Sequence, residues 1–234
     1  NPKESSKYIK KCFYLAHKLC VQKKLKGFIN CAVDKKNLFK NKNIGITEFL
    51  SKKNNLNNSE VMMIYNKKLS VAPLTTHIEL KNVPKSLKMV NLKKKIVTLN
   101  NFYIKYFKIK PRIAVLGLNP HNSELKKNSE EAKIIIPMIK SLKKKYKISG
   151  PFSADTAFIK NNRKKYDVIV GMFHDQVLAP FKTLFEFDAI NITLGLPYIR
   201  ISPDHGIAKD KIMLNKSNPK SLNECVKLIS SLKK

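Results

Sequence analysis

The 234-residue sequence has little arginine, little glycine and no tryptophan. Only Arg112, Arg163 and Arg200 are arginines among 47 basic residues, so lysine carries almost all of the positive charge. Surfaces that bind nucleic acid usually keep arginine, because its guanidinium group contacts phosphates and bases in a bidentate manner. We therefore interpret the net charge of +31 as lysines on solvated surfaces and expect no nucleic-acid partner.

Several sequence features of membrane and secreted proteins are also missing. No stretch approaches the roughly 20 apolar residues of a membrane span, and no signal-peptide pattern opens the chain. The four cysteines show no CxxC spacing, which favours reduced thiols in a cytoplasmic protein. The first residue is asparagine, so the sequence leaves room for a preceding leader or N-terminal segment.

Apolar periodicity predicts alternating strands and helices. We expect helices at 5–24, 91–108, 129–146 and 219–233, and strands at 28–33, 61–65, 69–77, 112–119, 166–173 and 189–196. Ser129, followed by Glu130 and Glu131, is typical of a helix start. The Lys/Asn-rich segment 51–59 is the expected exposed loop. This alternation predicts an α/β protein with a sheet between helices.

Six of the seven glycines lie at the ends of predicted strands or in the loops that follow them. In an open α/β sheet, the loops at the carboxyl ends of the strands bind ligands. The glycine positions therefore suggest, without specifying, a ligand site at that edge.

Four of the five histidines lie at this predicted edge. His77 ends one strand, His121 and His174 follow two others, and His205 lies beyond the strand at 189–196. Imidazole is the commonest transition-metal ligand, and three such ligands leave a position open for substrate. One strand-end histidine alone would more often be structural, but four together favour a metal site. The remaining His17 lies in the first helix and fits a surface position.

The spacing leaves the metal open between Zn, Mn, Co and Mg. Asp175 directly follows His174, and Asp204 precedes His205, so each aspartate could orient a histidine or act as a base.

An anionic substrate is suggested by Lys182, Asn191 and Arg200, which are polar residues in the most apolar third of the chain. Arg200 could contact a phosphate or carboxylate in a bidentate manner. An ordinary ion pair with Asp188 or Glu186 is an equally good interpretation from chemistry alone.

Successive segments resemble, in order, the motifs of the 4-hydroxythreonine-4-phosphate dehydrogenase family, whose members act in pyridoxal phosphate biosynthesis. They are TTH (75–77), GLNPH (117–121), GPFSADT (150–156), FHDQVLAPFK (173–182), NITLGLPYIR (191–200) and SPDHGIA (202–208). The resemblance extends from about residue 5 to the C-terminus, and the HDQ and NITLGLP segments are highly specific.

The resemblance implies a fold like that of isocitrate and isopropylmalate dehydrogenases, with two α/β domains around a cleft, in a homodimer. Residues 1–234 would form one family unit that lacks roughly 95 N-terminal residues. Its sub-domains would be approximately 36–205, carrying the metal and substrate site, and 1–35 with 206–234.

The resemblance also assigns site residues. His77 and His121 would bind a divalent metal together with His174 of the partner subunit. The substrate would be held by Thr47, Lys182, Asn191 and Arg200. Weaker candidates are Asp175, for proton transfer or for orienting His174, and Lys35, which matches a family lysine near the cleft.

The implied reaction is NAD- or NADP-dependent oxidation of 4-phosphooxy-L-threonine to 2-amino-3-oxo-4-phosphooxybutanoate. Loss of carbon dioxide would then give 3-amino-2-oxopropyl phosphate. A bound metal would lower the pKa of the substrate hydroxyl and polarise the ketone. No residue of this chain is assigned to the nicotinamide cofactor.

The sequence departs from the family pattern at three places. Ile46, in GITEF, replaces a histidine that normally contacts the substrate phosphate. The glycines that usually follow the NPH motif are replaced in the segment 121–128, and the family's Gly/Pro-rich opening segment is absent.

Two alternatives remain open at this stage. One is an enzyme of the same family that oxidises 4-phosphothreonate or 4-phosphoerythronate. The other is an inactive truncated domain or a lysine-rich binding protein.

Overall fold

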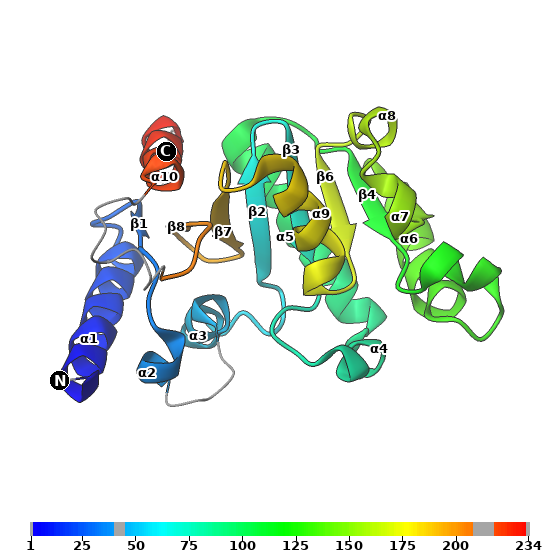
Figure 1. Cartoon of the computed structure of the whole chain (residues 1–234). Coiled ribbons are helices and arrows are strands. Elements are labelled where there is room, and N and C mark those ends of the chain that lie inside the picture. The colour runs from blue at the N-terminus through cyan, green and yellow to red at the C-terminus, as the bar shows by residue number, and fades with distance from the viewer. Residues whose placement is uncertain (1, 40–44, 208–217, 233–234) are drawn as a thin grey trace.

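In the computed structural model, which describes residues 2–39, 45–207 and 218–232, eight strands form one mixed sheet with helices on both faces (Figure 1). The strand order is β1-β8-β7-β2-β3-β6-β4-β5. The strands are β1 (Gly27–Ile29), β2 (Val61–Asn66), β3 (Leu69–Pro73), β4 (Ile113–Leu116), β5 (Ile148–Phe152), β6 (Val168–Gly171), β7 (Ile190–Leu194) and β8 (Ile199–Pro203). The pairs of β2 with β3, β2 with β7, and β7 with β8 are antiparallel, and the other pairs are parallel.

Alternation along β2 separates the two apolar layers. Val61 and Met63 pack into one cluster, and Met62 and Ile64 into the other. The first cluster is covered by α5 (Met89–Phe102), α6 (Ile136–Lys143) and α10 (Lys220–Ser231), and the second by α7 (Ala154–Ala157) and α9 (His174–Phe185). The sheet therefore sits between helices, as predicted.

A third apolar cluster joins the N-terminal helices to the sheet. Phe13 of α1 (Pro2–Val21), Leu38 of α2 (Lys35–Phe39), and Ile46 and Leu50 of α3 (Ile46–Lys53) are buried together. The remaining short helices are α4 (Val83–Ser86) and α8 (Lys160–Arg163), with 3-10 or π turns at Leu80–Asn82, Tyr103–Phe107, Pro120–Leu125 and Glu131–Ile135. No helix within the described ranges is long and apolar enough to cross a membrane.

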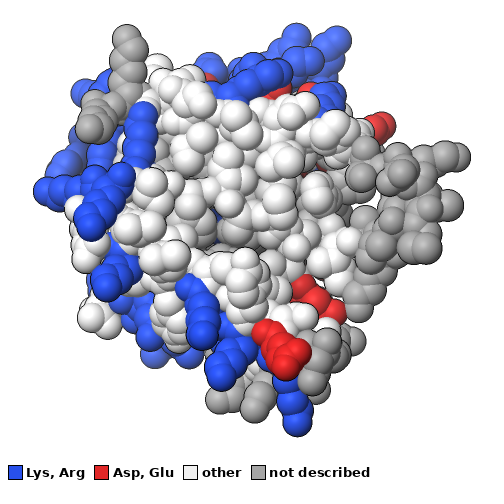
Figure 2. Space-filling model, turned by 90° about the vertical axis from the view of Figure 1, so that its left-hand side faces the viewer, with Lys and Arg blue, Asp and Glu red and all other residues white. Residues whose placement is uncertain are grey.

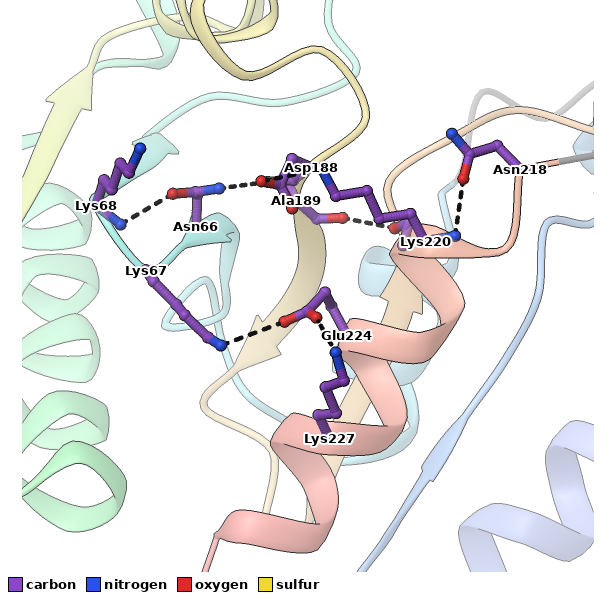
Figure 3. A network of polar contacts seen from close by, with 10 residues as sticks. Asn66, Lys67, Lys68, Asp188, Ala189, Asn218, Lys220, Glu224 and Lys227 are labelled. Atoms are coloured by element: carbon purple, nitrogen blue, oxygen red, sulfur yellow. Dashed lines mark hydrogen bonds and ion pairs between the residues drawn. The ribbon is translucent and has the colours of Figure 1, made fainter.

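Polar contacts attach the C-terminal helix to the turn between β2 and β3 (Figure 3). Glu224 of α10 pairs with Lys67 at 3.6 Å, and Asn66 donates to the backbone oxygen of Asp188 at 2.5 Å. Lys220 lies 3.4 Å from the Asp188 carboxylate. These contacts are exposed at their lysine ends, so packing of α10 on the sheet holds the helix more than the ion pairs do.

The positive charge is not continuous over the surface. Figure 2 looks onto the left-hand side of Figure 1 and shows a broad uncharged surface bordered by lysine and arginine side chains. Tyr8 and Leu15, on α1, are 70% and 58% exposed. On this face, the positive charge surrounds the uncharged area and does not cover it.

The predicted elements occur with altered ends. β1 and β3 are shorter than predicted and end at Ile29 and Pro73, and the helix from 129 starts as a π turn. The Ser129 hydroxyl accepts a hydrogen bond from the amide of Ala132, as expected of a helix start. The predicted exposed loop 51–59 is wrong at its beginning, because α3 continues to Lys53 and buries Ser51.

Candidate active site

Six of the predicted site residues meet in one cavity of about 410 Å³. They come from α3, the loop after β3, α9, β7 and β8. The six are Thr47, His77, His174, Lys182, Asn191 and Arg200. His205, from the loop after β8, also lines this cavity, which therefore combines three imidazoles with two cations and two neutral polar groups.

The rings of His77 and His174 lie side by side, with centroids 6.0 Å apart. His77 Nδ1 is 3.1 Å from Glu48 Oε1, and His174 Nδ1 is 2.7 Å from Asp175 Oδ1. With each Nδ1 bonded to a carboxylate, the Nε2 atoms are the nitrogens left for a ligand. This donor arrangement fits a divalent metal.

Glu48 is the more enclosed of the two carboxylates. It also accepts a hydrogen bond from the Thr76 hydroxyl at 2.6 Å. Burial by itself would raise the pKa of Glu48, but the hydrogen bonds from His77 and Thr76 outweigh it and lower the pKa to about 2. Glu48 is therefore ionised at neutral pH.

His121 lies apart from the other two predicted metal ligands. It is exposed and does not line the cavity that His77 and His174 share. Within the described ranges, no three side chains of histidine, cysteine, aspartate or glutamate are grouped as a metal site. One chain therefore brings together His77 and His174 but not His121.

The turn that carries His121 has an unusual backbone. The five residues from His121 to Leu125 all have positive φ angles, between 48° and 57°. Asn122 donates to the backbone oxygen of Pro151 at 3.2 Å, which ties this turn to β5. None of these five residues is glycine, although glycine adopts this left-handed conformation more easily than residues with a Cβ atom.

Arg200 is a buried cation in the cavity wall, only 3% exposed. Its Nε donates to Asn30 Oδ1 at 2.7 Å, and a terminal nitrogen donates to Thr193 Oγ1 at 3.0 Å. Burial lowers the pKa of Arg200 to about 10, so it stays protonated at neutral pH.

The alternative ion pair of Arg200 with Asp188 or Glu186 does not form. Asp188 pairs with Lys220, and no carboxylate of the described chain lies within ion-pairing distance of Arg200. A buried cation that keeps only neutral partners is ready for an anionic ligand.

Thr47 and Asn191 lie beside this arginine. Thr47 Oγ1 is 3.1 Å from Thr193 Oγ1, which links α3 to β7. Asn191 Oδ1 is buried and has no hydrogen-bond partner among the described residues. It is therefore available to a donor on a ligand.

Lys182 extends from α9 toward the loop after β8. Its Nζ donates to the backbone oxygen of Asp204 at 2.8 Å and lies 2.5 Å from the Asp204 carboxylate. Burial raises the pKa of Asp204, and the ion pair with Lys182 opposes this shift. The pair holds the Lys182 side chain in the cavity wall.

Two further residues hold the loops that follow β4 and β6. Gln176 accepts a hydrogen bond from the Met172 amide at 2.7 Å and donates to the Gly117 oxygen at 2.6 Å. The completely buried Glu131 accepts hydrogen bonds from the amides of Leu118 and Asn119, both at 2.8 Å. These bonds fix the segment that leads to His121.

The two weaker candidates have different positions. Asp175 is 83% exposed and is hydrogen-bonded to His174. Lys35 is the first residue of α2, and its side chain lies outside the described part of the structure.

Sequence reasoning missed Asn30, Glu48 and Thr193. A signal existed for Thr193, because it lies two residues beyond Asn191 on the same strand and so shares its face. Asn30 and Glu48 reach the site only through tertiary contacts, so no local pattern identifies them.

Residues 1–229 match the family model described as "Pyridoxal phosphate biosynthetic protein PdxA". A 4-hydroxythreonine-4-phosphate dehydrogenase of Aquifex aeolicus is 44% identical over 190 residues, which cover 80% of this chain and 58% of the relative. One of Sulfurihydrogenibium sp. is 45% identical over 176 residues, covering 74% and 54%. The chain thus spans little more than half the length of these relatives.

The crystal structure of a 4-hydroxythreonine-4-phosphate dehydrogenase from Klebsiella pneumoniae superposes with a TM-score of 0.80 at 30% identity. The match covers 95% of this chain and 69% of that one. The predicted fold of the isocitrate/isopropylmalate dehydrogenase type is thereby confirmed. The sub-domain boundaries stay a prediction.

Proposed function

We propose, because the chain belongs to the family of the pyridoxal phosphate biosynthetic protein PdxA, that it supplies most of the active site of an NAD-dependent dehydrogenase. The reaction would oxidise 4-phosphooxy-L-threonine to 2-amino-3-oxo-4-phosphooxybutanoate. This product would lose carbon dioxide to give 3-amino-2-oxopropyl phosphate, a precursor in pyridoxine 5'-phosphate biosynthesis.

One observation carries the proposal: a buried arginine, which has no carboxylate partner in the described part of the chain, lines the same cavity as two adjacent histidines. The substrate has two anionic groups, a phosphate and a carboxylate, and its reacting hydroxyl lies between them. Arg200 would neutralise one anionic group, and Lys182, while paired with Asp204, would donate a hydrogen bond to the other, with Thr47 and Asn191 as further hydrogen-bonding groups. The hydroxyl would then lie at the histidines.

His77 and His174 would hold a divalent metal through Nε2, since each Nδ1 is engaged by a carboxylate. A bound Zn, Mg, Co or Mn ion would acidify the substrate hydroxyl and polarise the ketone that forms. The NAD or NADP that accepts the hydride is assigned by chemical class alone, without binding residues.

The sequence analysis expects His77 and His121 from one subunit and His174 from its partner. The position of His121 favours a different assignment of the three ligands to the two subunits. His77 and His174 adjoin one another within one chain, whereas His121 is exposed and outside the cavity. We therefore propose that the site is completed by His121 of the partner subunit in a homodimer. The metal site would then require dimerisation.

Asp175 would orient His174, a role that its 2.7 Å contact supports more than proton transfer. Lys35 stays a candidate from the family resemblance alone. The four cysteines are free thiols, which supports a reducing, cytoplasmic location.

The phosphothreonate or phosphoerythronate alternative differs in the group beside the carboxylate, a hydroxyl in place of an ammonium. The unpartnered Asn191 Oδ1 is an acceptor for a donor at that end of the substrate, and an ammonium group satisfies it with charge assistance. This observation favours the amino substrate.

The proposal is tested by NADH formation and by calorimetric binding with the purified chain. We expect 4-phosphooxy-L-threonine to bind in the presence of a divalent metal and to yield NADH, and His121→Ala to lose both metal binding and turnover. NADH formation from 4-phosphothreonate, with none from 4-phosphooxy-L-threonine, would instead support the related enzyme that oxidises 4-phosphothreonate or 4-phosphoerythronate. Tight, metal-independent RNA binding that weakens steeply with salt would support the lysine-rich binding protein.

A further inference from the structure

Glu48 connects two separate walls of the cavity. It belongs to α3, whereas Thr76 and His77, to which it is hydrogen-bonded, belong to the loop after β3. One carboxylate oxygen, Oε1, receives both contacts, and the other, Oε2, is buried and has no hydrogen-bond partner among the residues that the structure describes. The two contacts at Oε1 therefore fix the position of the Glu48 carboxylate.

This contact determines which nitrogen of His77 carries the proton. Glu48 Oε1 accepts a hydrogen bond from the Thr76 hydroxyl and lies 3.1 Å from His77 Nδ1, so an Nδ1–H that donates to the same oxygen completes this geometry. In the neutral imidazole, the lone pair is then on Nε2, the nitrogen that a metal would bind.

The corresponding pair at the second histidine is built differently. Asp175 is adjacent to His174 in the chain and is 83% exposed, whereas the side chain of Glu48 is only 26% exposed. A solvated aspartate can turn away to water, so it restrains its histidine less. Of the two pairs, that of Glu48 with His77 is the more constrained.

The backbone at Gly45 leaves space for this pair. A Cβ atom at Gly45 would lie 2.8 Å from His77 Cε1 and would overlap Glu48 Oε2. Both closest neighbours are thus the two side chains of the pair. Glycine at this position lets the imidazole and the carboxylate meet beside the backbone.

We infer that Glu48 is a positioning residue for the metal site, which fixes the ring orientation and tautomer of His77 so that Nε2 is presented to the metal. Gly45 serves the same arrangement by leaving room for it. This inference rests on the proposed function, because it assumes that His77 is a metal ligand.

The test compares metal affinity and the state of His77 in three variants. Co²⁺ or Zn²⁺ binding to the purified chain is measured by calorimetry, and the His77 tautomer by nitrogen NMR of the metal-free protein. We expect Glu48→Gln to weaken metal binding roughly 10- to 100-fold. In the metal-free protein, the nitrogen NMR spectrum of His77 should change from one tautomer with the proton on Nδ1 to a mixture of tautomers. Glu48→Asp, which keeps the charge but withdraws it from His77, should lose affinity similarly.

Gly45→Ala provides an independent variant in which the carboxylate remains. We expect the same loss of affinity, because the added Cβ displaces the pair. Glu79→Gln is the matched control: Glu79 is exposed, lies two residues after His77 and pairs with Lys81 at 2.9 Å. It should bind metal like the unaltered chain.

The outcomes separate this inference from the proposed function. Failure of the unaltered chain to bind metal would contradict the metal site itself. Metal binding that survives Glu48→Gln and Gly45→Ala within twofold would overturn the positioning role and leave the metal site standing. If Glu48→Gln fails to fold, the NMR signature of the unaltered protein still decides, since an Nε2–H tautomer of His77 contradicts the inference.

Discussion

Arg200 donates a hydrogen bond to Thr193 at 3.0 Å, yet no carboxylate of the described chain balances its charge. The two residues face each other across β7 and β8, where Thr193 is paired with Arg200 in the register of the strands. The sheet thus carries a buried positive charge next to the cavity.

The first prediction concerns this charge. We expect Arg200→Met to change the free energy of unfolding by only about 1 kcal/mol, because removing an uncompensated buried charge offsets the lost hydrogen bonds. Binding of inorganic phosphate or substrate should nevertheless be lost. Thermal unfolding with and without phosphate measures both effects, and Lys164→Met, an exposed cation outside the cavity, is the control. Phosphate stabilisation that persists in Arg200→Met would contradict the assignment.

Ile46→His should alter stability and binding in opposite directions. Ile46 lines the cavity and packs with Phe13 and Leu50, so a polar ring there should lower the free energy of unfolding by about 1–3 kcal/mol. The added donor should strengthen binding of the phosphorylated substrate roughly 5- to 30-fold. Calorimetry with Ile46→Ala as the control separates the donor from the lost packing. Equal affinities in the two variants would show that the donor does not reach the phosphate.

Asp167 should stabilise the fold at neutral pH and lose this effect in acid. Burial acts to raise the pKa of Asp167, but hydrogen bonds from Arg112, including one from its backbone amide at 2.7 Å, lower it overall. A lowered folded-state pKa means that the stabilisation is complete above the unfolded value of about 3.9 and is lost as the pH falls through the folded value.

Asp167→Asn should therefore cost about 1–2 kcal/mol at pH near 7, measured by urea unfolding, and progressively less below about pH 4. A difference between variant and unaltered chain that grows in acid would have the wrong sign for this account.

Ser123→Gly should stabilise the turn that carries His121. Ser123 has φ of 50°, and a left-handed conformation costs a residue with a Cβ atom about 1–2 kcal/mol. Allowing for the greater freedom of glycine in the unfolded chain, we expect a gain of about 1 kcal/mol and a melting temperature about 2–4 °C higher. Ser141→Gly, within α6, is the matched control and should destabilise. A lower melting temperature for Ser123→Gly would contradict the turn conformation.

The sequence predicts the central strands well because these buried strands consist of consecutive apolar residues. β2 and β6 are such cases: all four residues of β6 are buried. β5 and β8 were not predicted, since ISGPF contains glycine and proline and IRISP contains a charged residue. Arg200 can lie in a buried strand only because Asn30 and Thr193, distant in sequence, receive its donors.

Helix α9 was also missed, for a local reason. It contains Pro180, and its first residue, His174, directly follows the predicted strand 166–173. Proline normally disfavours a helix interior, so the periodicity of Val177, Leu178 and Phe181 was not recognised as helical. Their burial against the sheet outweighs the local preference.

The candidate site shows a similar division. His77 and His174 are predicted from their positions at strand ends, and Lys182 and Arg200 from their places in an apolar part of the chain; the family segments add their roles. Glu48 was not found, since its role depends on the meeting of α3 with the loop after β3. That meeting is a property of the assembled sheet.

The order of the strands has a consequence for how the protein folds. Gly27 pairs with Ile199, and Thr47 lies 146 residues from its partner Thr193, so the N-terminal part is joined to the sheet by partners more than half of the chain apart. Such non-local pairing slows folding, because a long loop must close before any contact compensates for the lost chain entropy. During synthesis, the segment from β1 to α3 must therefore remain without its partners until β7 and β8 have emerged from the ribosome. We expect this interval to be when the nascent chain depends most on chaperones.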